Sequence, residues 1–301
     1  MKIQKKFFLM CIPLVMLVLL ISACTSTGST GGSSNLTALQ VLQNSAKAMQ
    51  QLKSSHISFS LTGNAQTSAT PTSSSSPSSV NFSVKGNGDE ALPNESLQIT
   101  TAQGTHLAEI VLGNKVYIQN AKGQWYVLDK SSLQGITGNP FSGIDISNMN
   151  DILALAQHAQ ITDHGDQDLN GQSLRHITIA LDKQGLQQLL TQNGQLAGVI
   201  GQQAVNTIIN STKGFNSTLD IWIDETQFYV HRTELKLNIN ENLGAVTNGG
   251  TPTATTGSVP SNVSTTIDSI VDLSKFNETV NITAPANAIP TNNPVSIFTG
   301  Q

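Results

Sequence analysis

Cysteine is scarce in this sequence. Only Cys11 and Cys24 occur among its 301 residues, and both lie near the N-terminus. From residue 25 onward the chain therefore has no thiol, which excludes a disulfide framework, a thiolate metal site and a cysteine nucleophile in that part. Its folded part must be stabilised by a packed core alone.

Charged and aromatic residues are also few, at 11% and 5% of the chain. The 15 Lys and Arg residues are balanced by 19 Asp and Glu residues, and the basic residues form no stripe. A partner with a phosphate backbone would need such a stripe, so nucleic acid is excluded as a partner. Ser, Thr, Asn, Gln and Gly take the place of charged residues, as suits an exported protein.

One apolar run, residues 7–21, follows a basic start with three lysines. It is shorter than the roughly 20 residues that cross a bilayer as a helix, which disfavours a transmembrane anchor. A basic start, a short apolar core and small residues before a cut form an export signal. Because Cys24 directly follows Ser22-Ala23, the segment resembles a bacterial lipobox. The lipobox implies that residues 1–23 are removed and that Cys24 becomes a diacylglyceryl anchor.

We therefore expect a protein held by lipid at the extracytoplasmic face of the cell membrane. Residues 24–35 are predicted to form the lipidated cysteine and a flexible Ser/Thr/Gly tether. Residues 36–285 follow as a single domain. Low-complexity insertions are predicted at 66–79 and 243–262, and a loose C-terminal tail at 286–301.

The domain opens with an amphipathic helix, for which Asn35 or Thr37 is the predicted cap. Its apolar residues recur at spacings of three and four, ending near Ser54. Two more helical segments are predicted at 149–159 and 183–209. The second is weakened by its glycines, each of which costs about 1 kcal/mol relative to Ala.

Between these helices the hydrophobic period is two, which is typical of half-buried strands. The predicted strands are 57–61, 80–84, 97–99, 106–112, 116–118, 125–127, 160–163, 173–181, 217–224, 230–240 and 263–271. Short turns such as Gly113-Asn114 and Asn170-Gly171 connect neighbours. The predicted fold class is α+β, with a curved antiparallel sheet (a half-barrel) that has helices on its concave face.

Several segments together make the chain similar to a known family. They are 52–59, 113–118 with 123–126, 169–172, 221–224 and 272–277. In this order they resemble the LppX/LprAFG family of mycobacterial-type lipoproteins, whose fold is similar to that of the lipoprotein carriers LolA and LolB. The resemblance implies a half-barrel over helices that encloses an apolar cavity for acyl chains, and a role in lipid binding or transfer at the cell envelope. The two insertions and the low aromatic content depart from the family.

No arrangement of residues favours catalysis. The six histidines are scattered, without a HExxH spacing, and no Gly-x-Ser-x-Gly elbow occurs. His158 and His164, near Asp163 and Asp166, could be read as a metal site, but surface loop residues are the expected reading. We predict no catalytic residue, no metal and no cofactor.

Apolar strand residues are instead the candidates for a ligand site, because an acyl chain needs an apolar pocket and little else. For any one of them taken singly, ordinary core is the stronger reading. The predicted cavity-lining residues are Ile57, Phe59, Leu61, Phe82, Val84, Ile99, Val116, Ile118, Ile177, Ile179, Leu219, Ile221, Leu235 and Leu237.

Three functions fit these observations. The first is a lipoprotein that carries or presents an acyl lipid or glycolipid at the envelope, with an envelope transporter as a partner. The second is a sensory or protein-binding lipoprotein with a filled core, and the third is a structural role. The second would expose an apolar patch or an edge strand.

The glycine-containing segment 183–209 is predicted to be a mobile cover that admits lipid. We expect its amides to exchange with solvent faster than those of the central strands, because local opening needs little free energy there. Amide hydrogen exchange measures this, and exchange as slow as in the strands would exclude the cover.

Overall fold

The structure, a computed structural model, describes residues 35–68, 78–133, 149–157, 159–192, 215–242, 262–293 and 297. The export signal, Cys24, the tether and most of the second insertion lie outside these residues. So does the part of the predicted third helix beyond residue 192. No helix among the described residues is long and apolar enough to cross a membrane.

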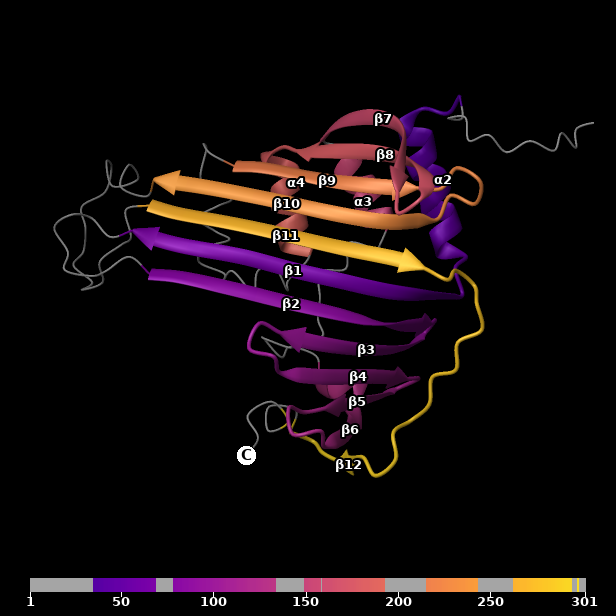
Figure 1. Cartoon of the computed structure of the whole chain (residues 1–301), viewed down its shortest axis with the longest axis vertical. Coiled ribbons are helices and arrows are strands. Elements are labelled where there is room, and N and C mark those ends of the chain that lie inside the picture. The colour runs from indigo at the N-terminus through magenta and orange to yellow at the C-terminus, as the bar shows by residue number, and fades with distance from the viewer. Residues whose placement is uncertain are drawn as a thin grey trace, which may run out of the picture. The chain divides into compact units, whose positions relative to one another are not determined.

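One sheet contains all twelve described strands (Figure 1). The strands are β1 (Ser54–Ser68), β2 (Ser78–Ala91), β3 (Asn94–Thr101), β4 (His106–Leu112), β5 (Lys115–Gln119), β6 (Trp125–Asp129), β7 (Ala159–Leu169), β8 (Gln172–Leu181), β9 (Phe215–Ile223), β10 (Val230–Asn242), β11 (Asn262–Ser274) and β12 (Ile289–Pro290). Their order is β12-β6-β5-β4-β3-β2-β1-β11-β10-β9-β8-β7. Every pairing is antiparallel except that of β12 with β6, so the predicted antiparallel sheet is confirmed.

Local turn chemistry connects the neighbouring strands. Gly113 and Gly171 have φ angles of 59° and 83°, a left-handed conformation that glycine adopts without steric cost. The strand pairs β4–β5 and β7–β8 meet at these turns, as the sequence predicted. The pairing of β1 with β11 then joins the β1–β6 meander to the β7–β11 meander.

In the described part of the chain, three α-helices and one short 3₁₀ helix accompany the sheet. They are α2 (Ala38–Gln50), α3 (Met149–Ala156), α4 (Lys183–Gln192) and η1 (Lys130–Leu133). Thr37 caps α2 in a reciprocal capping box with Gln40, so one of the two predicted caps is confirmed. The face of the sheet that carries the helices is called the inner face here, and the opposite face the outer face.

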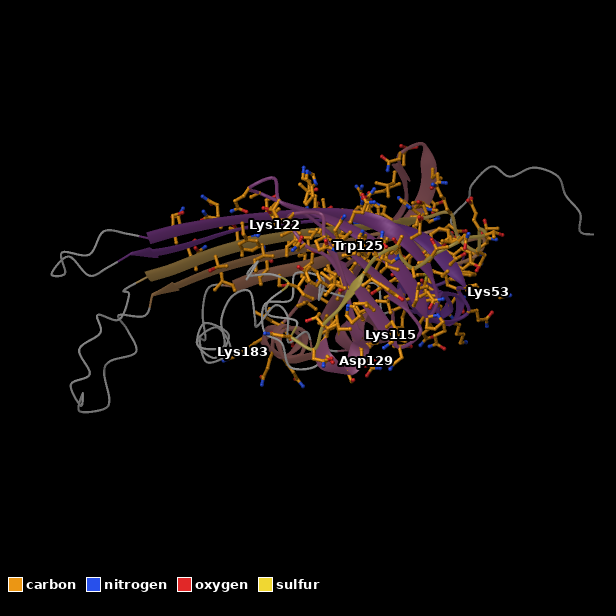
Figure 2. The ribbon with its side chains drawn as sticks, turned by 90° about the horizontal axis from the view of Figure 1, so that it is seen from below. Lys53, Lys115, Lys122, Trp125, Asp129 and Lys183 are labelled. Carbon is orange, nitrogen blue, oxygen red and sulfur yellow. The ribbon has the colours of Figure 1, made fainter. Side chains whose placement is uncertain are left out.

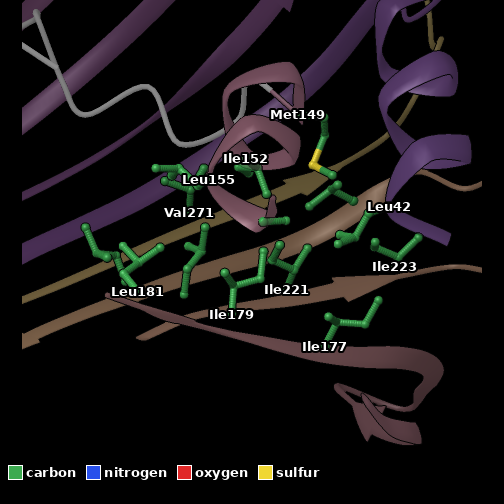
Figure 3. Packing of buried hydrophobic residues seen from close by; sticks show 14 of the residues in the cluster. Leu42, Met149, Ile152, Leu155, Ile177, Ile179, Leu181, Ile221, Ile223 and Val271 are labelled. Carbon is green, nitrogen blue, oxygen red and sulfur yellow. The ribbon is translucent and has the colours of Figure 1, made fainter. Parts of the chain in front are cut away.

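The main core lies between these helices and the inner face of β7–β11 (Figure 3). Leu42 of α2 and Ile152 and Leu155 of α3 pack over Ile179 and Ile221 of the sheet. All five side chains are at most 2% exposed. The amphipathic stripes of α2 and α3 are therefore used to cover the apolar face of the strands, as their spacing predicted.

A second, smaller core lies on the inner face of β3–β6. It consists of Ile99, Val111, Val116, Ile118, Leu128 and Ile297. Ile297 comes from the C-terminal tail, and Ile289–Pro290 pair with Tyr126 and Val127 of β6. The tail was predicted to be loose from residue 286, but these residues attach it to the sheet edge.

The strands around the first insertion are longer than predicted. β1 continues to Ser68 and β2 begins at Ser78, so both ends of the predicted 66–79 insertion belong to the sheet. Register explains the extension, because β1 pairs with both β2 and β11 along this stretch. The backbone N–H and C=O groups of β1 are therefore hydrogen-bonded on both edges of the strand, which does not depend on its side chains.

Arg175 lies on the inner face of the sheet, in the part that the helices cover, and its side chain is only 8% exposed. No other charged side chain of the described residues on this part of the face is so deeply buried. The Arg175 guanidinium donates to both carboxylate oxygens of Asp163 at 2.8 and 2.6 Å, to Glu225 at 3.2 Å and to the Leu36 carbonyl at 3.3 Å. This hydrogen bond holds the pKa of Asp163 below its usual value. One side chain thus connects β7, β8, the β9–β10 turn and the start of α2.

Replacing Arg175 with Met should lower the free energy of unfolding by about 3 kcal/mol, because two partly buried carboxylates lose their cation. Arg232 provides the matched control, since it forms a similar bidentate pair with Asp272 on the outer face. Its side chain is 23% exposed, so Arg232→Met should cost about 1 kcal/mol or less. Urea denaturation measures both, and equal losses would contradict the structural role given to Arg175.

Candidate ligand-binding face

A stripe of partly buried apolar side chains crosses the inner face beside the two cores. It is called the inner stripe here and consists of Ile57, Phe59, Leu61, Phe82, Val84, Leu97 and Leu107. These residues come from β1, β2, β3 and β4, whose order in the sheet is continuous. Side chains on either side of the stripe are fully buried, but those within it keep part of their surface accessible. Such an apolar surface can bind an apolar ligand.

Glycines shape the floor of the stripe. Gly86 faces Phe59 across the β1–β2 pair, and Gly63 faces Phe82. A Cβ atom at Gly86 would overlap the Phe59 ring, and one at Gly63 would overlap the Phe82 ring. Each phenyl ring therefore lies over the backbone of the opposite strand, which is a close approach that only glycine permits.

A polar row lies at one end of the stripe. Ser55, Glu90 and Glu95 are register partners on β1, β2 and β3, and all three side chains are on the inner face. The Ser55 hydroxyl donates to Glu90 at 3.0 Å. Glu109 of β4 lies in the adjacent row, directly opposite Leu97. The stripe therefore has an apolar body and a carboxyl-rich end.

Glu109 is the most buried of these acids, at 6% exposed. Burial, and then the neighbouring Glu95 carboxyl, raise the pKa of Glu109 to about 8. Its Oε2 atom has no hydrogen-bond partner among the described residues. At neutral pH the carboxyl is therefore protonated, so it can donate a hydrogen bond as well as accept one.

The structure places all fourteen predicted lining residues on the inner face. Nine are buried in the two cores, and five contribute to the inner stripe: Ile57, Phe59, Leu61, Phe82 and Val84. The prediction left out Leu97 and Leu107, which continue the same alternation on β3 and β4. It also left out the inward-facing acids. The sequence does indicate one of them, because Glu109 occupies an inner position of the largely apolar strand 106–112.

The histidines lie mostly on the outer face. His164 lies in β7 beside a bulge between Asp163 and Gly165, and not in a loop as predicted. It stacks on His176, which in turn stacks on Trp222 at a ring separation of 4.3 Å. His158 lies outside the described residues. In the described part of the chain, no three His, Cys, Asp or Glu residues are grouped to hold a metal ion.

Comparison with solved structures finds distant likenesses. LprF from Mycobacterium bovis is 14% identical, with a TM-score of 0.42, and the match covers 85% of this chain and 100% of that one. Lipoprotein LppX from Mycobacterium tuberculosis is 14% identical, with a TM-score of 0.39, over 83% and 100% of the two chains.

A third likeness is to a domain from Vibrio parahaemolyticus that is described as an outer membrane lipoprotein-sorting protein. It is 9% identical, with a TM-score of 0.23, over 81% of this chain and 93% of that one. No protein-family profile matches the sequence, and no curated protein matches it. These likenesses are too distant to assign the chain to a family.

The raised pKa of Glu109 makes stability depend on pH. Between pH 4.5 and about 8 the folded protein holds a proton that the unfolded chain has released. The free energy of unfolding should therefore fall as the pH rises through this range, by up to about 1.4 kcal/mol per pH unit.

Glu109→Gln removes this titration and should flatten the dependence, which urea denaturation at pH 5, 6, 7 and 8 measures. Asp268→Asn is the control, because Asp268 is an exposed carboxylate on the outer face of β11. It should leave the slope as in the wild type. A slope in Glu109→Gln as steep as that of the wild type would contradict the assignment.

Proposed function

We propose that this protein binds an acyl lipid or glycolipid on its inner face and carries or presents it at the cell envelope. The observation that carries the proposal is the inner stripe, whose apolar side chains are only partly buried beside two buried cores. A stripe of this kind would gain about 0.8 kcal/mol for each CH₂ group that it removes from water. The role is binding, because neither the sequence nor the described site provides a nucleophile with its base.

The carboxyl-rich end of the stripe supports a choice of headgroup. A phosphate placed there would lie close to Glu90, Glu95 and Glu109 and would be repelled by any that are ionised. Hydroxyl groups suit the row better, since carboxyl groups accept hydrogen bonds from them and a protonated carboxyl donates one back. We infer a neutral, hydroxyl-bearing headgroup, as on a glycolipid or a partly acylated glycerol.

An anchor at Cys24, which the lipobox resemblance implies, would restrict the domain to a single membrane leaflet. A tether of about ten residues has an r.m.s. length of roughly 15–20 Å, which is too short to cross a periplasm. The domain would therefore take lipid from, or deliver it to, the leaflet that holds its anchor. An envelope transporter is the partner that such a handover would need.

Native mass spectrometry of the soluble domain, without Cys24 and purified from a lipid-containing host, tests the proposal. We expect a bound mass of several hundred daltons or more that organic extraction removes. The extracted compound should be a glycerolipid or glycolipid. A protein that stays free of lipid after incubation with liposomes would favour the alternative of a partner-binding lipoprotein with a filled core.

Variants of β1 and β2 locate the lipid. Leu61 and Val84 are cross-strand partners on the inner stripe, whereas Ser60 and Ser83 are their neighbours on the outer face. The double variant Leu61→Gln, Val84→Asn should reduce lipid occupancy at least tenfold, because it places amides where the acyl chain would lie. The matched control Ser60→Gln, Ser83→Asn should retain lipid. Thermal unfolding of both variants checks that the fold is kept, and equal occupancy in the two would place the lipid elsewhere.

A further inference from the structure

A pocket of about 500 Å³ opens on the outer face, on the side of the sheet opposite the inner stripe. Its side chains come from β2, β3, β4, β5 and β6, which lie side by side in Figure 1. It is called the outer pocket here, and its volume is within the range of about 300–1,000 Å³ that small-molecule sites occupy. Ile99 and Leu107 also line it, but their register partners place their side chains on the inner face.

The centre of the outer pocket is one straight row of residues across five strands. Asn87 pairs with Gln98, Gln98 with Ala108, Ala108 with Gln119, and Gln119 with Trp125. Ala108 is 8% exposed and lies between two long amide side chains. The order of residues along this row explains the hollow, because the small side chain of Ala108 leaves a gap between the larger side chains on either side.

The lining combines amide, hydroxyl and basic side chains with the apolar side chains of Ala108, Ile110 and Trp125, and none of the described residues that form it carries a carboxylate. Amide groups both donate and accept hydrogen bonds, as sugar hydroxyls do. Lys85 and His106 lie in the next row, on either side of Thr100, whose hydroxyl is 3.0 Å from His106 Nδ1. These two bases would tolerate or attract an anionic substituent on a ligand.

Trp125 closes one end of the row and is labelled in Figure 2. Its indole is half-buried and offers a large, rigid apolar surface beside the amide of Gln119. A pyranose ring has an apolar face of C–H groups and an edge of hydroxyl groups. An indole next to a row of amides matches both parts of such a ring.

We propose that the outer pocket binds a glycan segment, with one sugar ring over Ala108 between Gln98 and Gln119 and the apolar face of a neighbouring ring against Trp125. A lining without carboxylates suits a neutral or anionic sugar and disfavours a cationic one. The site is independent of the lipid site, since it lies on the other face of the sheet. Either can fail in experiment without the other.

Tryptophan fluorescence can report on this pocket directly. The chain has two tryptophans, and Trp222 lies on β9, at the other end of the sheet from β6. In the full domain carrying Trp222→Phe, the emission reports on Trp125 alone. Titration with maltotriose, chitotriose and trigalacturonate should change this emission in a saturable way for at least one sugar. No saturable change with any of the three at 10 mM would overturn the proposal.

Filling the gap provides the decisive variant. Ala108→Leu, in the same background, should weaken binding at least tenfold because the leucine occupies the space between the two glutamines. Ala180→Leu makes the same change on the outer face of β8, outside the pocket, and should bind as before. Thermal unfolding shows whether Ala108→Leu is folded. If it is not, Gln98→Ala replaces it, with Asn238→Ala on β10 as its control. Binding that Ala108→Leu or its replacement leaves unchanged would overturn the proposal.

A free polysaccharide and a lipid-linked sugar would present the same chemistry to this pocket. Dodecyl maltotrioside distinguishes them when it is compared with maltotriose. Equal affinities would indicate a free glycan as the ligand. If the glycoside binds more tightly than maltotriose, and Ala108→Leu still weakens its binding, the ligand is a lipid-linked sugar. If only the glycoside binds, and Ala108→Leu does not weaken its binding, then the dodecyl chain is responsible for the binding and the glycan proposal is overturned.

Discussion

The antiparallel pairing of β1 with β11 is the constraint on which the rest of the structure depends. It runs without interruption from His56 opposite Ser274 to Ser68 opposite Asn262. It also joins two meanders that are each built from short local connections. Without it, the helix-covered core under β7–β11 and the smaller core under β3–β6 would belong to separate sheets. The inner stripe exists because this pairing places β1 and β2 between the two cores.

The two faces of the sheet use the same strands for different purposes. A residue on β4 whose side chain points inward, such as Leu107, contributes to an apolar surface, and its neighbour Ala108 contributes to the outer pocket, which has a mixed lining. Because side chains alternate strictly along a strand, the two surfaces can vary independently in sequence. The glycine opposite Phe82 belongs to the inner face, and the small side chain of Ala108 to the outer one.

Local features of the fold could be predicted from the sequence because local chemistry decides them. The Thr37 cap, the Gly113 and Gly171 turns and the period-two faces of β8 and β9 follow from nearby residues. The sheet order needed the β1–β11 pairing, which connects opposite ends of the domain. Ser68 and Ser78 are strand residues for the same reason, since ladder bonds override their low strand propensity.

The candidate sites were predictable only in part. Alternation identified which side chains share the inner face, but it could not distinguish those that stay half-exposed, such as Phe59, from those that are buried, such as Ile221. That difference depends on which strands the helices cover. The row from Asn87 to Trp125 depends on the registers of four successive strand pairs, so no spacing along the chain reveals it.

The position of β11 near the end of the chain affects how the protein is made. A chain synthesised from its N-terminus can complete the β1–β6 meander well before β11 emerges. Until then, the fifteen residues of β1 expose a long unpaired edge with Ile57, Phe59 and Leu61 beside it. Exposed edges of this kind pair readily with other chains, and pairings between distant segments form slowly. Pairing with β11 removes this edge and leaves β1 in the interior of the sheet.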